Sequence, residues 1–309
     1  MIKDFNICEP TRIDSHETIK MYEIMRFMMP NNDFTQTQKE NSLMDIIDNF
    51  DGFILDGFGV INIGNELIKG VIPFLNEVKR KNKHIFILTN GSTNPSVETA
   101  KKYINWKIPI SKELVVSPRD ALQQSLENFK DTKVFFIGKE VTPIKLNNLK
   151  VTNNIKDADL IVFLGSRIWN INDHDNLVNE LIRKKRNIFV CNPDISAPHG
   201  KFFSPEPGYW SLKIMQDANL NEKFFHWYGK PYHPVFNFVK NRLDNYSKKN
   251  IKKKNIAMIG DTLHTDILGA NAYGFSSILL TNYGLMKNMD IDRIIKNLKI
   301  YPSYIVGGY

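Results

Sequence analysis

Phe53-Ile54-Leu55-Asp56 is the stretch that decides the fold, because an unbroken apolar run ends there at a carboxylate. A second apolar run, 84–88, ends at Thr89, and residues 67–80 between the two runs repeat apolar side chains at helical spacing. Strand, helix and strand in this order are typical of a parallel βαβ unit. Since both strands are apolar throughout rather than alternating, we predict a sheet covered by helices on both faces.

The same rhythm returns in the last third of the sequence. An apolar run at 256–260 ends at Asp261, helical spacing precedes it at 235–243, and a further apolar run follows at 277–280. We predict that these elements complete the sheet begun by residues 53–55.

Between these two stretches lies a separate alternation of short strands and helices, with apolar runs such as 134–137 and 160–164. The fold class we predict is α/β, a Rossmann-like parallel-sheet core interrupted by an inserted α/β domain. The expected domains are an extension, 1–44; the core, 45–92 and 221–309; and the insertion, 93–220.

Charge and composition limit the classes of molecule that this chain is expected to bind. The 309 residues are 42% hydrophobic, enough to bury a large core, and the formal net charge is +8. The lysines are dispersed or sit in short runs such as 252–254 beside an apolar strand, so we expect no nucleic-acid partner. A positive field of this kind suits a small phosphorylated substrate.

The compartment expected is the cytoplasm. Cys8 and Cys191 are far apart and belong to no CxxC pair, which is against a disulfide framework or a zinc site. Charged residues interrupt the first residues, so no secretory signal is expected, and no apolar run approaches the roughly 18 residues of a membrane span. Association with a membrane is not expected, and assembly into a homo-oligomer stays open.

Small polar or charged groups stand at predicted strand ends or turns in four segments: Asp56, Thr89-Asn90-Gly91, Lys230, and Asp261 with Asp266. Taken singly, each is more often a turn residue than a site residue. Together they indicate a single binding site, because ligands of open parallel sheets bind beyond the carboxyl ends of the strands.

Each group has a use in phosphate-ester chemistry. A carboxylate such as Asp56 can attack phosphorus, and Thr89 with the amides of residues 90 and 91 can cradle phosphate oxygens. Lys230 can neutralise charge on those oxygens. Asp56 and Asp261 can share one Mg²⁺, and Asp266 can orient Lys230 or a metal-bound water.

These segments resemble the four motifs of the haloacid dehalogenase superfamily, in the right order: Leu55-Asp56-Gly57-Phe58-Gly59-Val60, Leu88-Thr89-Asn90-Gly91-Ser92, Gly229-Lys230-Pro231, and Ile259-Gly260-Asp261-Thr262 with Thr265-Asp266. Within the insertion, Asn192-Pro193-Asp194 is similar to a motif of the C2-type cap found in the NagD-like branch. The resemblance covers about residues 48–285 and leaves residues 1–44 outside it.

The resemblance implies a Mg²⁺-dependent phosphatase that acts through an aspartyl-phosphate on Asp56, with a sugar phosphate as the first candidate substrate. Catalytic roles then fall to Asp56, Thr89 and Lys230, and metal binding to Asp56, Asp261 and the backbone carbonyl of Phe58. Substrate contacts are expected from Asn90, Gly91, Arg167 and Asp194.

Phe58 departs from the pattern, because family phosphatases usually carry there the aspartate that protonates the leaving group. General acid–base catalysis is typically worth about 10²–10⁴ in rate. Another group such as His199, His233 or His264 can replace the acid, or the substrate can carry a good leaving group, as in a pyrophosphatase acting on a nucleotide-linked sugar. The third alternative is a catalytically weak or inactive binding protein on the same fold.

Overall fold

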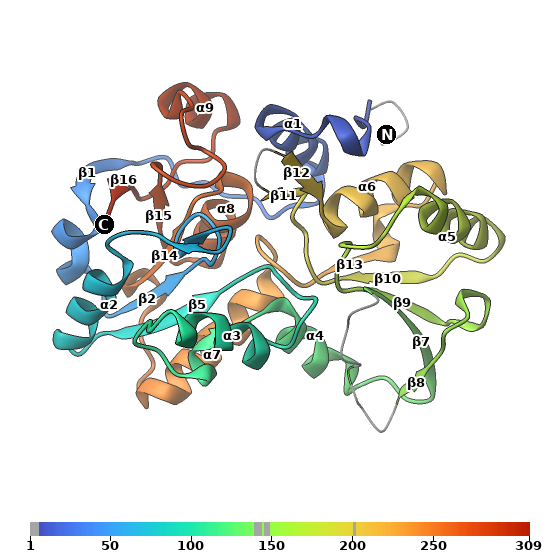
Figure 1. Ribbon diagram of the computed structural model, residues 1–309, viewed down its shortest axis with the longest axis horizontal. Helices are drawn as coiled ribbons and strands as arrows, with labels where there is room; N and C mark the ends of the chain where they lie inside the picture. The colour runs from blue at the N-terminus through green and yellow to red at the C-terminus, as the bar shows by residue number, and fades with distance from the viewer. Residues whose placement is uncertain (1–5, 139–143, 145–148, 200–201) are drawn as a thin grey trace. The chain divides into compact units, whose positions relative to one another are not determined.

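The computed structural model describes residues 6–138, 144, 149–199 and 202–309 (Figure 1). Contacts divide the chain into two compact units. We call the one formed by Met1–Met29, Asn90–Pro95 and Ser117–Gly229 the cap unit, and the one formed by Pro30–Thr89, Ser96–Val116 and Lys230–Tyr309 the core unit.

The core unit is built on a seven-stranded sheet with the order β1-β16-β15-β14-β2-β5-β6, parallel at every pairing. Leu55 pairs with Ile259 on one side and with Ile87 on the other, so the residues that follow these strands lie at one edge of the sheet. The strands are β1 (Gln38–Ser42), β2 (Gly52–Leu55), β5 (His84–Leu88), β6 (Val115–Val116), β14 (Ile256–Gly260), β15 (Ser276–Leu280) and β16 (Tyr304–Gly308).

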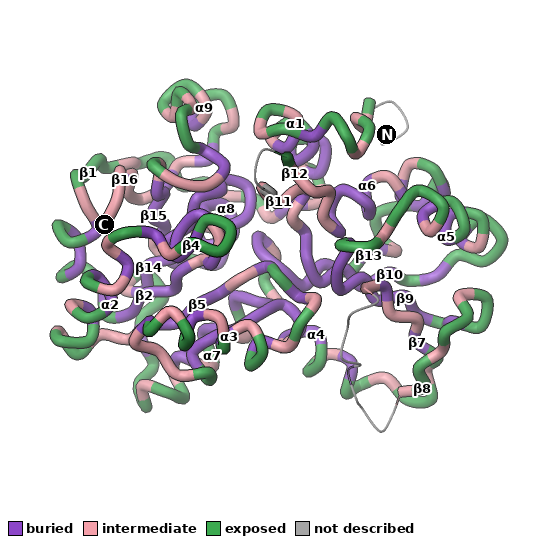
Figure 2. Tube along the Cα trace, viewed as in Figure 1, coloured by how far each residue is buried: buried purple, intermediate pink, exposed green. Residues whose placement is uncertain are grey.

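Apolar side chains fill both faces of this sheet, as predicted. Phe53 and Leu55 point into one hydrophobic cluster and Ile54 into another, because successive strand residues face opposite sides. Figure 2 shows the central strands as buried. The helices of the core unit are α2 (Val71–Arg80), α3 (Ser96–Asn105), α7 (His233–Ser247), α8 (Leu268–Tyr273) and α9 (Ile291–Leu298), and a small hairpin pairs β3 (Asn62–Ile63) with β4 (Glu66–Leu67).

The cap unit has its own parallel sheet, in the order β13-β10-β9-β7-β8. The inserted α/β domain predicted from the sequence is therefore present. Its strands are β7 (Thr132–Ile137), β8 (Leu149–Val151), β9 (Leu160–Phe163), β10 (Asn187–Val190) and β13 (Phe225–Trp227), with the hairpin β11 (Ser196–His199) and β12 (Phe202–Pro205) and the helices α1 (Ser15–Met25), α4 (Pro118–Leu126), α5 (Ile171–Arg183) and α6 (Pro207–Asp217).

Short helical turns complete the described elements. A π-helical turn, η9 (Leu263–Ile267), follows β14 and leads into α8. The 3₁₀ turns are η2 (Pro10–Arg12), η3 (Arg26–Met28), η4 (Leu43–Asn49), η5 (Lys112–Leu114), η6 (Ile155–Asp157), η7 (Glu222–Phe224) and η8 (Lys253–Asn255). Among the residues that the structure describes, no helix is both long and apolar enough to cross a bilayer.

The compact units do not share the predicted domain bounds. Residues 96–116, expected in the insertion, belong to the core unit, where β6 pairs with β5. The expected extension, 1–44, is divided: α1 lies in the cap unit, and β1 adds an edge strand to the core sheet beside β16. Apolar periodicity reports that a strand exists, but it does not say which sheet the strand joins.

Candidate active site

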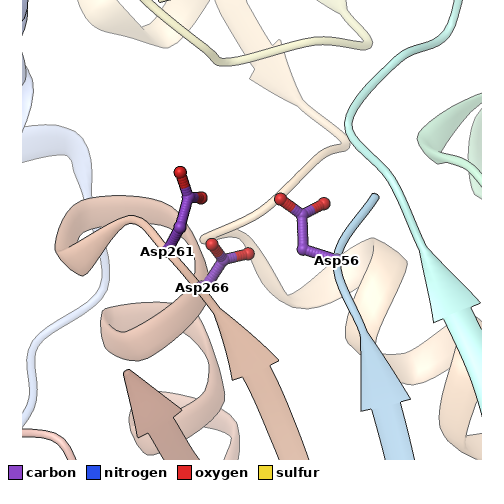
Figure 3. Close-up of side chains that lie close together, drawn as sticks. All are labelled: Asp56, Asp261 and Asp266. Carbon is purple, nitrogen blue, oxygen red and sulfur yellow. The ribbon is translucent and has the colours of Figure 1, made fainter. Parts of the chain in front are cut away.

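The carboxylates of the core unit converge at the carboxyl edge of its sheet. Asp56 follows β2, Asp261 follows β14, and Asp266 lies in η9. Figure 3 shows the three side chains close together, and each offers an oxygen within 4.8 Å of the others. Thr89 follows β5, next to β2 in the same sheet. The structure therefore brings Asp56 and Asp261 together as the sequence predicts, with Asp266 beside them.

Lys230 ties two of these carboxylates together. Its Nζ lies 2.6 Å from Asp56 Oδ1 and 2.6 Å from Asp266 Oδ1, and the residue is only 1% exposed. Burial raises the pKa of the Asp266 carboxyl, against the lowering effect of the Lys230 charge. Removing one partner of such a buried ion pair destabilises the folded protein, because an uncompensated charge is left in the interior.

Gly260, at the end of β14, leaves the space that the Asp266 side chain fills. A Cβ on Gly260 would lie 2.1 Å from the Cβ of Asp266, so a larger residue at the end of β14 would push this carboxylate away. Asp266 Oδ2 also accepts a hydrogen bond from the Thr262 backbone N–H at 3.2 Å, which fixes its orientation toward Lys230.

Asp261 is held by donors on both oxygens. The Leu285 backbone N–H donates to Oδ2 at 2.8 Å, and Thr262 Oγ1 donates to Oδ1 at 3.1 Å. Burial, and after it the neighbouring Asp56 charge, raises the pKa of Asp261 to about 7. Buried carboxylates in this situation are stabilised by a cation.

The donor set fits a hard divalent cation. Asp56 uses Oδ1 for Lys230, so Oδ2 is the oxygen on the side away from that contact. Carboxylate oxygens from one or two residues are how proteins usually hold Mg²⁺. Asp56 and Asp261 are therefore the residues that would hold it, with Asp266 engaged by Lys230.

Glycines line the space around Asp261. A Cβ on Gly284 would lie 1.7 Å from Asp261 Oδ2, and Gly284 has a φ of +67°. We expect Gly284→Ala to destabilise the protein by clearly more than the roughly 1–2 kcal/mol of left-handed strain alone, because the new methyl group displaces the carboxylate. Gly64→Ala is the matched control, since Gly64 has a φ of +55° and open space around it. Urea unfolding of both variants gives the two losses of stability. Equal losses would contradict the claim that the methyl group displaces the Asp261 carboxylate.

The loop that carries Phe58 is fixed by its own backbone. The Gly59 N–H donates to the Asn62 carbonyl at 2.8 Å, and the Asn62 N–H donates to the Gly57 carbonyl at 3.1 Å. Phe58 is half-buried and has no group that can transfer a proton.

The histidines considered as substitutes for an acid lie in different settings. His264 is fully buried within η9, whereas His233 is exposed at the start of α7 and packs edge-on against Tyr273. His199 is the last residue of β11 and pairs with Phe202 of β12.

Two residues of α3 are near enough to Asp56 for its charge to act on their pKa values, and sequence reasoning missed both. A Cβ on Gly57 would lie 2.5 Å from the Tyr103 hydroxyl, and burial followed by the Asp56 charge raises the pKa of Tyr103. Lys102 Nζ donates to Asn62 Oδ1 at 3.2 Å, and burial lowers the pKa of its ammonium while Asp56 opposes that shift. Nothing in the helical pattern of α3 separates these two from ordinary core and surface positions.

The remaining predicted site residues fall in the cap unit. Asn90 is buried, and its Nδ2 donates to Asp194 Oδ1 at 2.8 Å. Gly91 and Arg167 are exposed. Near Arg167 in the sequence, the Trp169 ring packs against the Phe163 ring, with the ring centres 5.5 Å apart.

Comparison with known proteins connects this geometry to a family. A family model described as haloacid dehalogenase-like hydrolase matches residues 53–152, and a second, described as HAD-hydrolase-like, matches 227–306.

Two of the relatives match this chain over most of their length. An acid sugar phosphatase of Staphylococcus haemolyticus is 23% identical over 249 residues, which cover 78% of this chain and 90% of the relative. The ribonucleotide monophosphatase NagD of Escherichia coli is 22% identical over 251 residues, covering 81% and 95%. The crystal structure of a possible sugar phosphatase of the HAD superfamily from Cytophaga hutchinsonii superimposes with a TM-score of 0.76 at 24% identity, covering 88% of this chain and 98% of that one.

Proposed function

The chain belongs to the haloacid dehalogenase superfamily, in its NagD-like branch, and on that premise we propose that it is a Mg²⁺-dependent phosphatase of a small phosphorylated metabolite, first among them a sugar phosphate. The observation that carries the proposal is Lys230, buried between Asp56 and Asp266 with Asp261 alongside. The names of the relatives support the substrate class, and the free thiols of Cys8 and Cys191 support a cytoplasmic location.

The proposed chemistry is in-line attack on phosphorus by an oxygen of Asp56. The phosphoryl group passes to Asp56 as an aspartyl-phosphate, and the leaving group departs with the electron pair of the broken P–O bond and takes a proton from water. Attack of water on the aspartyl-phosphate then releases inorganic phosphate and restores the Asp56 carboxylate. Lys230 neutralises charge on the phosphoryl oxygens and fixes the Asp56 rotamer through its 2.6 Å contact.

The other core-unit residues hold the phosphate and the metal. Thr89 offers its hydroxyl to the phosphoryl oxygens. Asp56, Asp261 and the Phe58 carbonyl are the proposed metal ligands, and the bound Mg²⁺ supplies charge stabilisation. We assign substrate contacts to Asn90, Gly91, Arg167 and Asp194 of the cap unit, which makes this unit the cap domain of the enzyme.

The missing acid at position 58 gives the sharpest test of this function. We expect an aryl phosphate to be hydrolysed about 10²-fold or more faster than a simple alkyl phosphate, because an alkoxide leaving group needs the proton that Phe58 cannot give. Phe58→Asp should narrow that gap by speeding the alkyl ester by about ten-fold or more. Initial rates on both esters, with and without Mg²⁺, measure the effect.

His233→Ala is the control for a substitute acid, since this histidine is exposed on the core unit. A selective loss on the alkyl ester in that variant would assign the proton to His233. Fast hydrolysis of the alkyl ester in both the unmodified chain and His233→Ala would contradict the expected rate gap and would exclude His233 as the source of the proton.

A second candidate function, ligand binding without turnover, is favoured by the same residue, Phe58. It predicts no hydrolysis of any phosphate ester and a ligand affinity that Asp56→Asn leaves unchanged. An activity screen on phosphorylated metabolites, pyrophosphates and nucleotide-linked sugars included, separates the two functions.

A further inference from the structure

Helix α1 lies outside both matched family regions, yet it is part of the cap unit. Asp14 caps its N-terminus by accepting a hydrogen bond from the Glu17 N–H at 2.8 Å. One face of the helix is buried, and that face consists of Thr18, Met21, Tyr22, Ile24 and Met25. A short helix is stabilised mainly by packing of this kind, so α1 depends on the cap unit for its structure.

The polar groups on the buried face meet the segment that follows Asn192-Pro193. The Tyr22 hydroxyl donates to Asp194 Oδ1 at 3.4 Å and accepts a hydrogen bond from the Ile195 N–H at 3.3 Å. One turn earlier, the Thr18 hydroxyl hydrogen-bonds the Ser196 hydroxyl at 2.7 Å. The three residues 194–196 are therefore contacted in succession by one helix face.

Asp194 is held from several directions at once. Its Oδ1 accepts from Asn90 as well as from Tyr22, and its own N–H donates to Asn192 Oδ1 at 2.9 Å. The carboxyl of Glu206 is close enough that removal from water, together with the Asp194 charge, raises the pKa of Glu206 to about 8. A carboxylate beside a second acidic group needs its donors to keep one orientation.

We propose that Tyr22 is a positioning residue for Asp194, so that α1 completes the substrate-contacting loop of the cap and sets selectivity without taking part in the chemistry. The inference rests on the proposed function, because it gives Asp194 a substrate contact. It assigns to the first part of the extension a role as a built-in piece of the cap.

The test compares Tyr22→Phe, which removes one hydroxyl and keeps the packed ring, with Lys20→Gln on the exposed side of the same helix. Lys20 pairs only with Glu17 of its own helix among the described residues. A net hydrogen bond is worth about 0.5–1.5 kcal/mol, so we expect KM for the best phosphorylated substrate to rise about 2- to 12-fold in Tyr22→Phe while kcat stays unchanged. Lys20→Gln should change neither constant.

Amide hydrogen exchange of the intact protein gives a second readout that needs no substrate. The Ile195 N–H should exchange about 2- to 12-fold faster in Tyr22→Phe than in the unmodified chain or in Lys20→Gln, because its acceptor is gone. Unchanged exchange at Ile195 would overturn the inference. Faster exchange with an unchanged KM would overturn it too, since the loop would then have no bearing on substrate.

The two readouts keep this inference separate from the proposed function. Absence of phosphatase turnover in the unmodified chain would refute the proposed function, whereas normal turnover with no effect of Tyr22→Phe would refute the positioning role alone.

Discussion

Asp56→Asn is expected to lower the rate of phosphate-ester hydrolysis by at least about 10³-fold, equivalent to about 4 kcal/mol of transition-state stabilisation. The amide oxygen of asparagine is a poor nucleophile, so the route through an aspartyl-phosphate closes. In the unmodified chain Lys230 Nζ lies 2.6 Å from Asp56 Oδ1. The asparagine side chain keeps this shape and can still accept a hydrogen bond from Lys230, so the fold should survive. Initial rates on an aryl phosphate with Mg²⁺, together with a thermal unfolding curve, provide the measurement.

Asp292→Asn is the matched control for this variant. Asp292 is an exposed aspartate of the core unit, paired with Lys39 on the surface, so its loss should leave the rate unchanged. Near-normal turnover in Asp56→Asn would exclude the covalent mechanism. The thermal unfolding curve shows whether a loss of activity comes from an unfolded protein instead.

Lys230→Met is expected to lower the free energy of unfolding by about 3–5 kcal/mol and to remove most of the activity. The substitution leaves the Asp56 and Asp266 carboxylates facing each other without the ammonium that contacts both. Urea unfolding followed by fluorescence gives the free energy, and rates on the same aryl phosphate give the activity.

Lys240→Met controls for the loss of a buried lysine as such. Lys240 is 6% exposed, lies on α7 and contacts Asp244 one turn away. Its loss should cost less stability and no activity. If Lys230 acts as described, the double variant Lys230→Met/Asp266→Asn should regain part of the lost stability, because one uncompensated carboxylate is gone. Strictly additive losses would contradict the ion-pair account.

The sheet edge of the core could be predicted from the sequence because its signals are local. Apolar runs that end at Asp56, Thr89 and Asp261 identify buried parallel strands, and parallel strands bring their carboxyl ends to one edge. The role predicted for Asp266 in orienting Lys230 matches the 2.6 Å contact between them.

Helix ends were harder to place. The helix expected over 67–80 begins at Val71, because Gly70 takes a φ of +99° and the preceding residues form the β3–β4 hairpin. In the extension, α1 spans Ser15–Met25 and begins where Asp14 caps it. Polar capping residues act within one turn and are easily missed beside the stronger apolar periodicity.

The parts that escaped prediction depend on contacts between distant positions. Tyr22 and Asp194 are 172 positions apart, and no periodicity links them. The two-residue strand β6 follows η5, and its place in the core sheet is set by pairing with β5. Tyr103 reads as a core aromatic until its hydroxyl is seen beside Gly57.

The order of strands in the core sheet has a consequence for biosynthesis. The ribosome makes β2 early, yet β2 pairs with β14, which emerges only after the whole of the cap unit. The cap unit can therefore fold on the nascent chain while one side of β2 still has no neighbour. Non-local pairings of this kind slow folding, and an unpaired apolar strand is prone to aggregate. Because one side of β2 stays unpaired until β14 is synthesised, we expect chaperone binding to the nascent chain throughout that interval.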